Sequence, residues 1–414
     1  MKILWFEVTE PAGYRNTGDF IGGWQDSLEI QIRKRTDIEL FVAFSSKYEH
    51  IPIVKDRVTY IPIPTNLSFV EHIQSLFTCS VEAKKLVPQA LSIIKKINPD
   101  VIHVFGVEWC WGLVAAYVNI PVVIHIMGSM IPYYNAIYPP NYNSFTVLKY
   151  LFPQIRPLFH FFSDYYYQRS RVKNEKRIWK TVNNYMGRTK WDFALSKILA
   201  PNSNYFHVNE ALRESFLSPD IQWTPPQSKI RLVSTGCSSF WKGPDMFLKT
   251  AKLLKEYGLD FEWNIAGNIN KSIKKVVEKK EKCSLESCNI KILGFISPIE
   301  LVKLLSSSTL YIHTAYIENS PNSICEAQCV GIPVISTNVG GISTLVSDNV
   351  DGLLVPANDP WQLAYSIIEL VSNMDKMKEF SNKARIKALE RHNPYLIEKD
   401  LLSCYSQLIN VTIK

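Results

Sequence analysis

The sequence lacks several features that would place it in a specialised class of protein. Its eight cysteines do not have the paired spacing of a zinc site, and several lie in apolar runs, so buried reduced thiols are expected. It contains no internal repeat and no low-complexity tract, and its formal net charge of +8 is moderate. These absences leave an ordinary globular balance, and 414 residues are enough for two or more domains with real cores.

No secretion signal is expected at the start of the chain, because its first apolar stretch is short and Glu7 ends it. A longer apolar run, 109–127, contains no Asp, Glu, Lys or Arg and is as long as a membrane span. The same run also suits a crossover helix followed by a buried strand, and Asn119, Pro121 and His125 favour that interpretation. We therefore expect a cytoplasmic protein, with any membrane contact made at the inner face of the plasma membrane.

The first half of the chain alternates between β-rich runs and helical ones. Such alternation indicates parallel βαβ units and a doubly wound sheet. A second series of the same kind begins at Ile230, after the stretch 218–229, which is a linker by composition. The expected strands are 3–6, 39–44, 58–63, 101–105, 122–126, 230–234, 261–266, 290–293, 310–313, 334–336 and 353–355, and the expected helices include 24–32, 81–97, 244–257, 298–305 and 394–408.

Two glutamates, Glu318 and Glu326, lie eight positions apart around the start of an expected helix. The strand 310–313 leads into a loop that holds Glu318, and Pro321 suits the first turn of the helix that carries Glu326. Free N–H groups at that helix start favour an anion, and ligands of open parallel sheets bind at these strand ends. This is a layout for a nucleotide sugar, although two solvated glutamates would fit the spacing alone.

More of the pattern follows Glu326. The run G-I-P-V at 331–334 precedes a glycine pair, Gly340 and Gly341, whose missing side chains would let backbone approach a ligand closely. D-G-L-L-V follows at 351–355. The ordered set E-x7-E, G-x-P-V, G-G and D-G-L-L-V resembles the signature of retaining glycosyltransferases of family 4, the glycosyltransferases group 1.

The resemblance implies an α/β fold of the GT-B type, in which two Rossmann-like doubly wound domains face each other across a cleft. It is strong over roughly 230–360 and weaker elsewhere. The implied domains are 1–217 on the acceptor side, joined by a returning helix at 394–414, and 230–393 on the side of the nucleotide sugar. The implied setting is the synthesis of a bacterial cell-surface polysaccharide.

A cation for the departing diphosphate is expected at Lys242, which ends a loop before the helix that follows Gly243. In the family such a Lys-Gly pair binds the diphosphate, usually together with an Arg a few residues earlier. Here that stretch holds Gly236, Cys237 and Ser238 and no Arg, so Lys242 is the main expected charge. Gly236 and Gly243 would border the donor. The competing interpretation is a surface lysine ahead of a helix.

The same resemblance assigns the other donor residues. Glu326 would bond the ribose hydroxyls, Glu318 would lie near the donor sugar and reaction centre, and backbone N–H groups of Asn322 and Ser323 would meet the phosphates. Relatives often carry a glutamate after the glycine pair, where this chain has Ile-Ser-Thr344, so no catalytic acid is expected there. Because no Asp-x-Asp occurs, we expect no metal and no cofactor, only a UDP- or GDP-linked sugar as substrate.

In the first domain, Gly22 and Gly23 would form a turn that lets donor or acceptor approach the backbone. Many relatives carry a sugar-binding histidine at a position that falls on Met127 here, next to Gly128. His125 lies two residues earlier. It either replaces that histidine or is a core histidine with its hydrogen bonds satisfied.

Two further loops resemble those of bacterial polysaccharide transferases of this family. One is Gly106-Val-Glu108, and the other runs from Gly187 through Arg188 to Asp192. Arg188 and Asp192 would shape the cleft, or would form an internal ion pair. Glu108 and Arg188 are therefore candidate contacts for the sugar or the acceptor.

A basic cluster follows an aromatic run in the segment 159–180. Cations beside aromatic rings suit the face of an anionic membrane and would also suit single-stranded nucleic acid. We expect peripheral membrane contact that reaches a lipid-diphosphate acceptor, and no nucleic acid; a solvated helix face packed by its aromatic side is the competing interpretation. The cluster comprises Arg169, Arg171, Lys173, Lys176, Arg177 and Lys180.

The resulting expectation is a retaining, metal-independent glycosyltransferase that moves a sugar from a nucleotide diphospho-sugar to a saccharide or lipid-linked acceptor. Two alternatives stay open. One is a nucleotide-sugar hydrolase or epimerase of the same fold. The other is a non-catalytic sugar-nucleotide-binding protein, which the missing Arg, Met127 and Thr344 would suit.

Overall fold

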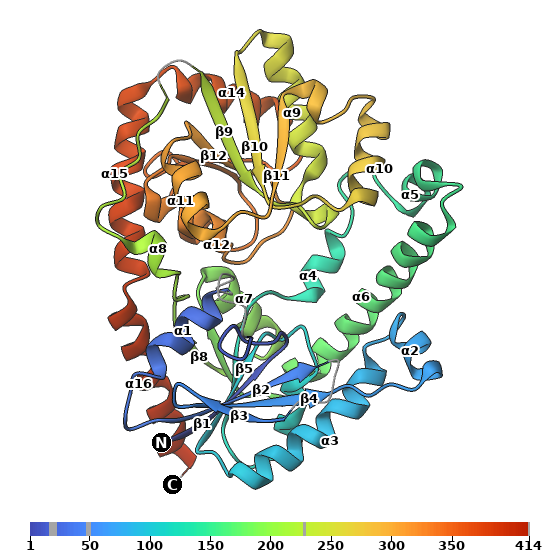
Figure 1. The fold of residues 1–414 in the computed structure, drawn as a ribbon, viewed down its shortest axis with the longest axis vertical. Coiled ribbons are helices and arrows are strands. Elements are labelled where there is room, and N and C mark those ends of the chain that lie inside the picture. The colour runs from blue at the N-terminus through green and yellow to red at the C-terminus, as the bar shows by residue number, and fades with distance from the viewer. Residues whose placement is uncertain (16–22, 47–50, 227–228, 413–414) are drawn as a thin grey trace. The chain divides into compact units, whose positions relative to one another are not determined.

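The computed structural model describes residues 1–15, 23–46, 51–226 and 229–412. The chain forms two compact units, and each is described by itself (Figure 1). Unit 1 comprises Met1–Tyr134, Phe161–Ala211 and His392–Lys414, and unit 2 comprises Asn135–His160 and Leu212–Arg391.

Unit 1 is built on an eight-stranded sheet with the order β3-β4-β2-β1-β5-β6-β7-β8. Neighbouring strands are parallel except at the edge, where β3 runs antiparallel to β4. Strand order reverses between β1 and β5, and ligands of such sheets bind beyond the carboxyl ends of the strands near that point. The strands are β1 (Lys2–Glu7), β2 (Glu39–Ser46), β3 (Ile53–Lys55), β4 (Val58–Pro64), β5 (Val101–Phe105), β6 (Val122–His125), β7 (Asn184–Gly187) and β8 (Asn204–His207).

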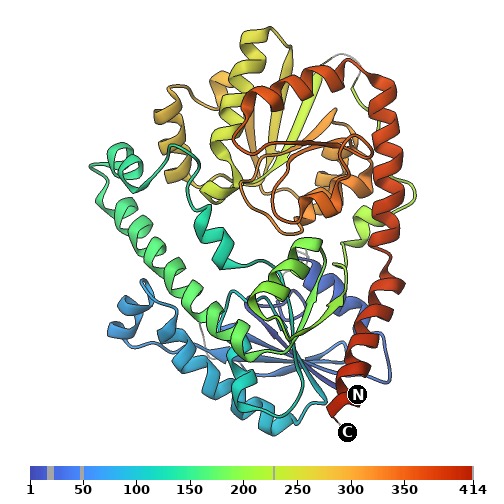
Figure 2. The same ribbon diagram turned by 180° about the vertical axis from the view of Figure 1, so that it is seen from behind.

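Both faces of this sheet are buried, because alternate residues of each strand point to opposite sides. Ile3 and Trp5 pack in a cluster with residues of α1 and α16, whereas Leu4 and Phe6 pack with residues of α3 and η1. Figure 2 shows α16, in dark red, alongside the sheet. The helices that lie wholly or partly in unit 1 are α1 (Trp24–Ile32), α2 (Phe69–Ser75), α3 (Ser80–Ile97), η1 (Trp111–Tyr117), α4 (Met130–Asn135), α6 (Ile155–Thr181), α7 (Lys190–Leu199) and α16 (Pro394–Thr412).

Unit 2 has a fully parallel sheet with the order β11-β10-β9-β12-β13-β14. Its strands are β9 (Ile230–Thr235), β10 (Phe261–Ala266), β11 (Ile290–Gly294), β12 (Leu310–His313), β13 (Val334–Thr337) and β14 (Leu353–Val355). Its helices are α5 (Ser144–Leu151), α8 (Glu214–Leu217), η2 (Phe240–Lys242), α9 (Pro244–Tyr257), α10 (Lys271–Glu281), η3 (Glu286–Cys288), α11 (Pro298–Ser306), α12 (Asn322–Val330), α13 (Ile342–Leu345), α14 (Pro360–Val371) and α15 (Met374–Arg391).

One segment lies outside the unit in which the sequence placed it. Residues 135–160 were expected in the first domain but belong to unit 2, where α5 packs on α10. Tyr142 holds this segment in place, because its hydroxyl donates to Glu281 Oε1 at 2.7 Å and its ring lies 4.3 Å from Lys280 Nζ. The sequence between 128 and 165 gave no periodic pattern that would have indicated this excursion.

The expected linker and the expected returning helix are each assigned to one unit. Much of the expected linker 218–229 packs on unit 2, where Trp223 Nε1 donates to the carbonyl of Ser308 at 2.8 Å. The terminal helix α16 belongs to unit 1, as the returning helix of the expected fold should. Within unit 1, Trp5 Nε1 donates to Tyr405 Oη at 3.0 Å and ties α16 to the central strand.

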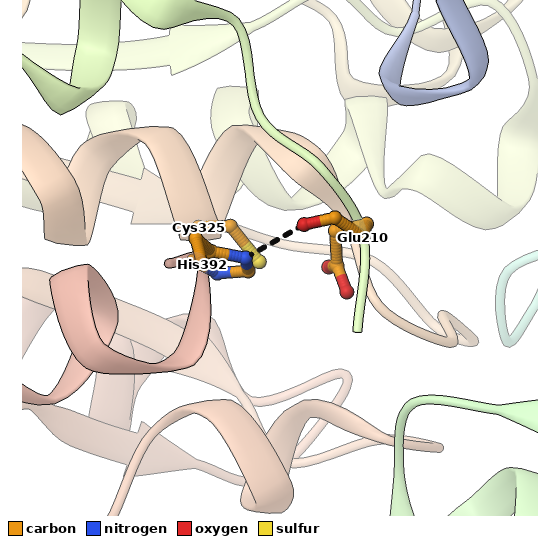
Figure 3. A group of neighbouring side chains, drawn as sticks. All are labelled: Glu210, Cys325 and His392. Carbon is orange, nitrogen blue, oxygen red and sulfur yellow. Dashed lines mark hydrogen bonds between the residues drawn. The ribbon is translucent and has the colours of Figure 1, made fainter. Parts of the chain in front are cut away.

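The loop that precedes α16 is held by a histidine. His392 Nδ1 makes a hydrogen bond of 3.0 Å with the backbone carbonyl of Glu210, which follows β8 (Figure 3). Because His392 lies two residues before Pro394, this bond fixes where the terminal helix begins in unit 1.

The uncharged run 109–127 forms η1 and strand β6, and the crossover-and-strand interpretation of this run is confirmed. The crossover helix is a 3₁₀ helix. In the described part of the chain, no helix combines the length and the apolar content that crossing a bilayer requires.

Candidate functional site

The centre of the candidate site in unit 2 is an ion pair between Lys242 and Glu318. Lys242 ends the short helix η2, which follows β9, and Glu318 lies in the loop between β12 and α12. Lys242 Nζ lies 2.9 Å from Glu318 Oε1 and 2.6 Å from Oε2. The Glu318 side chain is only 9% exposed and that of Lys242 is 31% exposed. The structure thus brings together the two residues that the sequence assigned to catalysis.

Two glycines allow the chain to bring this pair together. Gly243 has φ +73°, and a side chain there would clash with the backbone carbonyl of Thr314, whose hydroxyl bonds back to the Lys242 carbonyl at 3.1 Å. Gly340 has φ +52°, and a side chain there would clash with the carbonyl of Glu318. That carbonyl also accepts a hydrogen bond from the backbone N–H of Gly341 at 3.0 Å. The Gly340-Gly341 segment therefore contacts and supports the backbone of the Glu318 loop.

This arrangement revises the expected role of the glycine pair. Close approach of backbone to a ligand was expected at Gly340 and Gly341. The atom that a side chain at Gly340 would meet first belongs to the protein's own Glu318. Glycine is needed at position 340 because the loop that follows β13 passes within backbone contact of the Glu318 loop.

His313, the last residue of β12, is a site residue that the sequence analysis did not select. Its side chain is buried, and Nε2 has no hydrogen-bond partner among the described residues. Burial lowers its pKa to about 4; Glu318 opposes this shift and Lys242 adds to it, so both charges lie close to the ring. The sequence signal for His313 was its position at the end of an expected strand, just before the loop that carries Glu318. The same position is equally typical of a core histidine.

Glu326 lies in the second turn of α12 and forms a second ion pair, with Arg213. Arg213 Nε and Nη2 both donate to Glu326 Oε1, at 3.0 and 2.5 Å. Burial raises the pKa of Glu326, and the guanidinium opposes that shift. Arg213 itself stacks over the ring of Phe216 at 4.8 Å. A buried carboxylate with a fixed cation on one of its oxygens is thereby held in one orientation.

The start of α12 lies between the two glutamates. Its N-cap is Pro321, and no side chain caps the helix. The first backbone hydrogen bonds of the helix are donated by residues 324 and 325, after Asn322 and Ser323. The Tyr311 hydroxyl bonds with Thr235 Oγ1 at 3.0 Å. Burial raises the pKa of Tyr311 to about 12, and its hydrogen bonds with Ser323 and Thr235 oppose that shift. This helix start can attract an anion.

Gly236 lies beside the end of β10. A side chain there would come within 3.0 Å of the Asn268 carbonyl and 3.1 Å of its N–H, and Cys237 N–H donates to the same carbonyl at 3.2 Å. Gly236 thus permits contact between two loops at the strand ends of unit 2, which is a structural reason for glycine at this position.

In unit 1, Glu108 lies in a cradle formed by two glycines. A side chain at Gly106 or at Gly128 would come into conflict with the Glu108 carboxylate, and Gly106 has φ +88°. Enclosure raises the pKa of Glu108, whereas Arg171 and Arg188 oppose the shift. The structure therefore places Gly128 and Arg188, two other residues expected at the site, beside the half-buried carboxylate of Glu108 beyond the ends of β5 and β6.

Arg188 is buried and turned toward the backbone of the β6 loop. Its Nη2 donates to the Met127 carbonyl at 3.0 Å, and its guanidinium lies 5.2 Å from the ring of Trp24. Asp192 does not pair with this guanidinium; it accepts the backbone N–H of Arg188 at 2.7 Å and closes a capping box with Thr189 at the start of α7. Of the two alternatives for Arg188 and Asp192, the internal ion pair is not formed, and the Asp192 carboxylate caps the backbone instead.

His125 is a core histidine and does not replace the sugar-binding histidine of the family. It is fully buried, its Nε2 lies 3.2 Å from the Val208 carbonyl, and its ring packs 4.7 Å from that of Trp24. Burial lowers its pKa well below the usual value, so the ring is neutral. Gly23 begins α1, and a side chain there would meet nothing within 4 Å; Gly22 lies outside the described residues.

Glu175, on α6, is a second buried carboxylate near Glu108 that the sequence analysis missed. It accepts hydrogen bonds from the hydroxyl of Ser129, from Met130 N–H at 2.6 Å and from Trp179 Nε1 at 2.9 Å. Burial raises its pKa to about 7, which its hydrogen bonds oppose and the negative charge of Glu108 reinforces. It positions the loop that contains Gly128. It lies within the basic cluster of a long helix, and nothing in the sequence distinguished it from a surface glutamate.

Solved structures share the fold of this chain. A sucrose-phosphate synthase from Thermosynechococcus elongatus superposes with a TM-score of 0.73 over 99% of both chains, at 14% sequence identity. HepE of Anabaena, solved in complex with UDP-glucose, superposes with a TM-score of 0.64 over 98% of this chain and 100% of that chain, also at 14% identity. The chain has the GT-B fold.

The family follows from the sequence of unit 2. Residues 220–387 match the family model of glycosyl transferases group 1, so this part of the chain is a group 1 glycosyl transferase domain. The amylovoran biosynthesis glycosyltransferase AmsK of Erwinia amylovora is 25% identical over 43% of this chain and 45% of that protein. The putative colanic acid biosynthesis glycosyltransferase WcaL of Escherichia coli K12 is 27% identical over 44% and 46%. The chain thus spans less than half the length of these curated relatives.

Proposed function

We propose that the chain is a retaining glycosyltransferase that moves a sugar from a nucleotide diphospho-sugar to a saccharide or lipid-linked acceptor in cell-surface polysaccharide synthesis. The observation that carries the proposal is the Lys242–Glu318 pair, which lies at strand ends inside the group 1 region. The printed names of AmsK and WcaL support the polysaccharide setting, and HepE solved with UDP-glucose supports a UDP-linked donor over a GDP-linked one.

Lys242 would stabilise the departing diphosphate. A diphosphate carries more negative charge than a carboxylate and offers more oxygens, so it would draw the ammonium group away from Glu318. The Asn322 and Ser323 N–H groups, at the positive end of α12, would bind the same diphosphate. A lysine and a helix start together supply positive charge without a metal ion. The helix start would then compensate in part for the Arg that the family usually carries and this chain lacks.

Glu318, once released from Lys242, would accept hydrogen bonds from the donor sugar. Glu326 would do the same for the ribose hydroxyls, because Arg213 occupies only its Oε1 and leaves Oε2 for a ligand. Arg213 fixes the Glu326 carboxylate before the donor arrives, which reduces the entropy lost on binding. From unit 1, Glu108 and the backbone at Gly128 would contact sugar or acceptor.

The transfer would proceed on one face of the sugar. The bond between the anomeric carbon and the diphosphate oxygen breaks, and the acceptor oxygen forms its bond on the face that the diphosphate leaves. The acceptor proton passes to a diphosphate oxygen. Configuration at the anomeric carbon is therefore retained. His313, whose pKa is lowered to about 4, would stay neutral beside Glu318 and add no charge to the site.

The test is to incubate the protein with UDP- and GDP-sugars and a membrane lipid extract, and to read the anomeric configuration of the product by NMR coupling constants. Retained configuration supports the proposal. Inverted configuration contradicts the mechanism, and equal sugar release with and without acceptor would point to a nucleotide-sugar hydrolase.

A further inference from the structure

Unit 1 contains a pocket of about 550 Å³ between α6 and the turn that joins α2 to α3. Figures 1 and 2 both show α2, in light blue, beside the green helix α6. Three exposed cations on α6, Arg169, Lys173 and Arg177, line the pocket. They are spaced four residues apart, so they lie along one face of the helix.

The charge in this pocket is not neutralised by the protein. Among the described residues that line it there is no Asp or Glu, and in the described part of the chain none of the three cations forms an ion pair. Arg171, which lies between them in sequence, is directed elsewhere, because its Nε donates to the Glu108 carbonyl at 2.9 Å. The pocket therefore concentrates three of the six basic residues in one concave site.

The floor of the pocket is a rigid polar turn. Ser170 Oγ lies 2.8 Å from Thr78 Oγ1 and accepts the Cys79 N–H at 3.1 Å, and the buried Asn174 donates to Cys79 Sγ at 3.2 Å. Thr78, Ser80 and Ser170 all line the pocket, and Thr78 Oγ1 also lies 2.5 Å from Ser80 Oγ, so the three hydroxyls form one hydrogen-bonded chain. The 18-residue helix α3 begins here, and the hydroxyls of Ser170 and Thr78 accept the backbone N–H groups of Cys79 and Ser80. The dipole of this helix adds positive potential to that of the three cations.

Apolar side chains stand exposed next to this pocket. On α2, Phe69 is 80% exposed, Val70 62% and Ile73 44%. Phe77, which follows α2, and Tyr166 of α6 form the aromatic part of the pocket lining, with ring centroids 6.5 Å apart. Exposed apolar groups beside cations are typical of a surface that meets a lipid headgroup layer.

We propose that this pocket binds the phosphate group of a phosphorylated ligand, held by Arg169, Lys173 and Arg177 and by the hydroxyls at the start of α3. The exposed apolar residues of α2 favour the headgroup of a membrane lipid over a soluble phosphate as its source. The pocket deepens the membrane contact expected for the proposed function. Since its binding is measured without sugar donor, its failure and that of the transferase are distinguishable.

The experiment uses the full chain and two probes. One probe is vesicles of phosphatidylcholine with 30 mol% phosphatidylglycerol, and the other is inorganic pyrophosphate measured by calorimetry. The pocket variant carries Arg169→Gln, Lys173→Gln and Arg177→Gln. The matched control removes the same charge from exposed positions on α3, by Lys84→Gln, Lys95→Gln and Lys96→Gln.

Each cation near an anionic surface strengthens binding roughly fivefold, so the pocket variant should lose about 100-fold in vesicle affinity and the control much less. A third variant, Phe69→Ser with Val70→Ser, should weaken vesicle binding and leave pyrophosphate binding unchanged. Pyrophosphate binding that only the pocket variant loses, without vesicle binding, would keep the phosphate site and overturn the lipid source. Equal losses in pocket and control variants, or no binding of either probe by the unaltered protein, would overturn the proposal.

Discussion

The ammonium group of Lys242 contacts both carboxylate oxygens of Glu318, at 2.9 and 2.6 Å, and the two residues are 76 positions apart in sequence. One follows β9 and the other follows β12, which are neighbours in the sheet. The parallel sheet therefore places the two loops at one edge, and the hydrogen bond from Gly341 N–H to the Glu318 carbonyl holds the backbone of the Glu318 loop there. If either side chain were removed, the other would keep an uncompensated charge. A single substitution therefore changes the charge environment of both positions.

Replacement of Lys242 tests its role in leaving-group stabilisation. Lys242→Ala should lower the rate of donor turnover by about 10²–10³-fold, because a fixed charge at a developing anion is worth that much. The matched control is Lys252→Ala on the exposed side of α9, which should leave turnover unchanged. Initial rates with a nucleotide-sugar donor make the comparison. Equal rates for Lys242→Ala and the unaltered protein would show that another group stabilises the diphosphate.

Gly340→Ala tests the contact that supports Glu318. Alanine at φ +52° carries a backbone strain of roughly 1 kcal/mol and also collides with the Glu318 carbonyl. Gly258→Ala carries comparable strain at φ +89° but meets nothing within 4 Å. The melting temperature should therefore fall further for Gly340→Ala, and its donor binding should also weaken. Equal falls in melting temperature in the two variants would mean that the Gly340 and Glu318 loops move apart without cost.

The buried Glu175 predicts a pH dependence of stability. Its pKa is raised from 4.5 to about 7 on folding, so between these pH values the folded protein binds more protons than the unfolded chain. Stability contributed by this group is thus present at acid pH and falls by on the order of 3 kcal/mol as pH rises to 7. Glu175→Gln cannot titrate and should flatten this part of the stability curve, followed by thermal unfolding. An unchanged slope in the variant would contradict the assignment.

Arg213 should matter mainly through Glu326. Arg213→Met leaves a buried carboxylate without its cation and should destabilise the protein by about 2–3 kcal/mol, below the full cost of a buried pair because Arg213 is 20% exposed. Adding Glu326→Gln to that variant should recover much of the loss. Chemical denaturation of the two single variants and the double variant completes the cycle. Strict additivity would show that the two residues do not interact.

Most of the fold could be predicted from the sequence, because parallel strands buried on both faces leave continuous apolar runs such as 3–6 and 122–124. The three strands β3, β7 and β8 were missed, as was the antiparallel pairing of β3 with β4. β3 and β8 lie at the two edges of the sheet and are only partly buried, so their apolar pattern fades. β7 is buried but has only four residues, which include an Asn and a Gly. The excursion 135–160 was missed because its attachment depends on tyrosine hydroxyls and lysines and not on periodicity.

The unit 2 site was predictable because its residues follow a fixed order along neighbouring strand ends. The partners of those residues were not. The pairing of Lys242 with Glu318 and of Arg213 with Glu326 joins positions 76 and 113 residues apart, and only the fold sets such distances. Asp192 illustrates the reverse error, since the nearby Arg188 suggested an ion pair, whereas the capping box at α7 used the carboxylate.

The measurement that tests the central claim most directly is binding of UDP, UDP-glucose, GDP and GDP-mannose by calorimetry. It compares the unaltered protein with Lys242→Ala, Glu326→Gln and the control Lys252→Ala. The account predicts that one nucleotide class binds, that Lys242→Ala and Glu326→Gln each weaken it at least tenfold, about 1.4 kcal/mol, and that the control does not. Binding of equal strength by all four proteins, or no binding by any, would contradict a nucleotide-sugar site built on Lys242, Glu318 and Glu326.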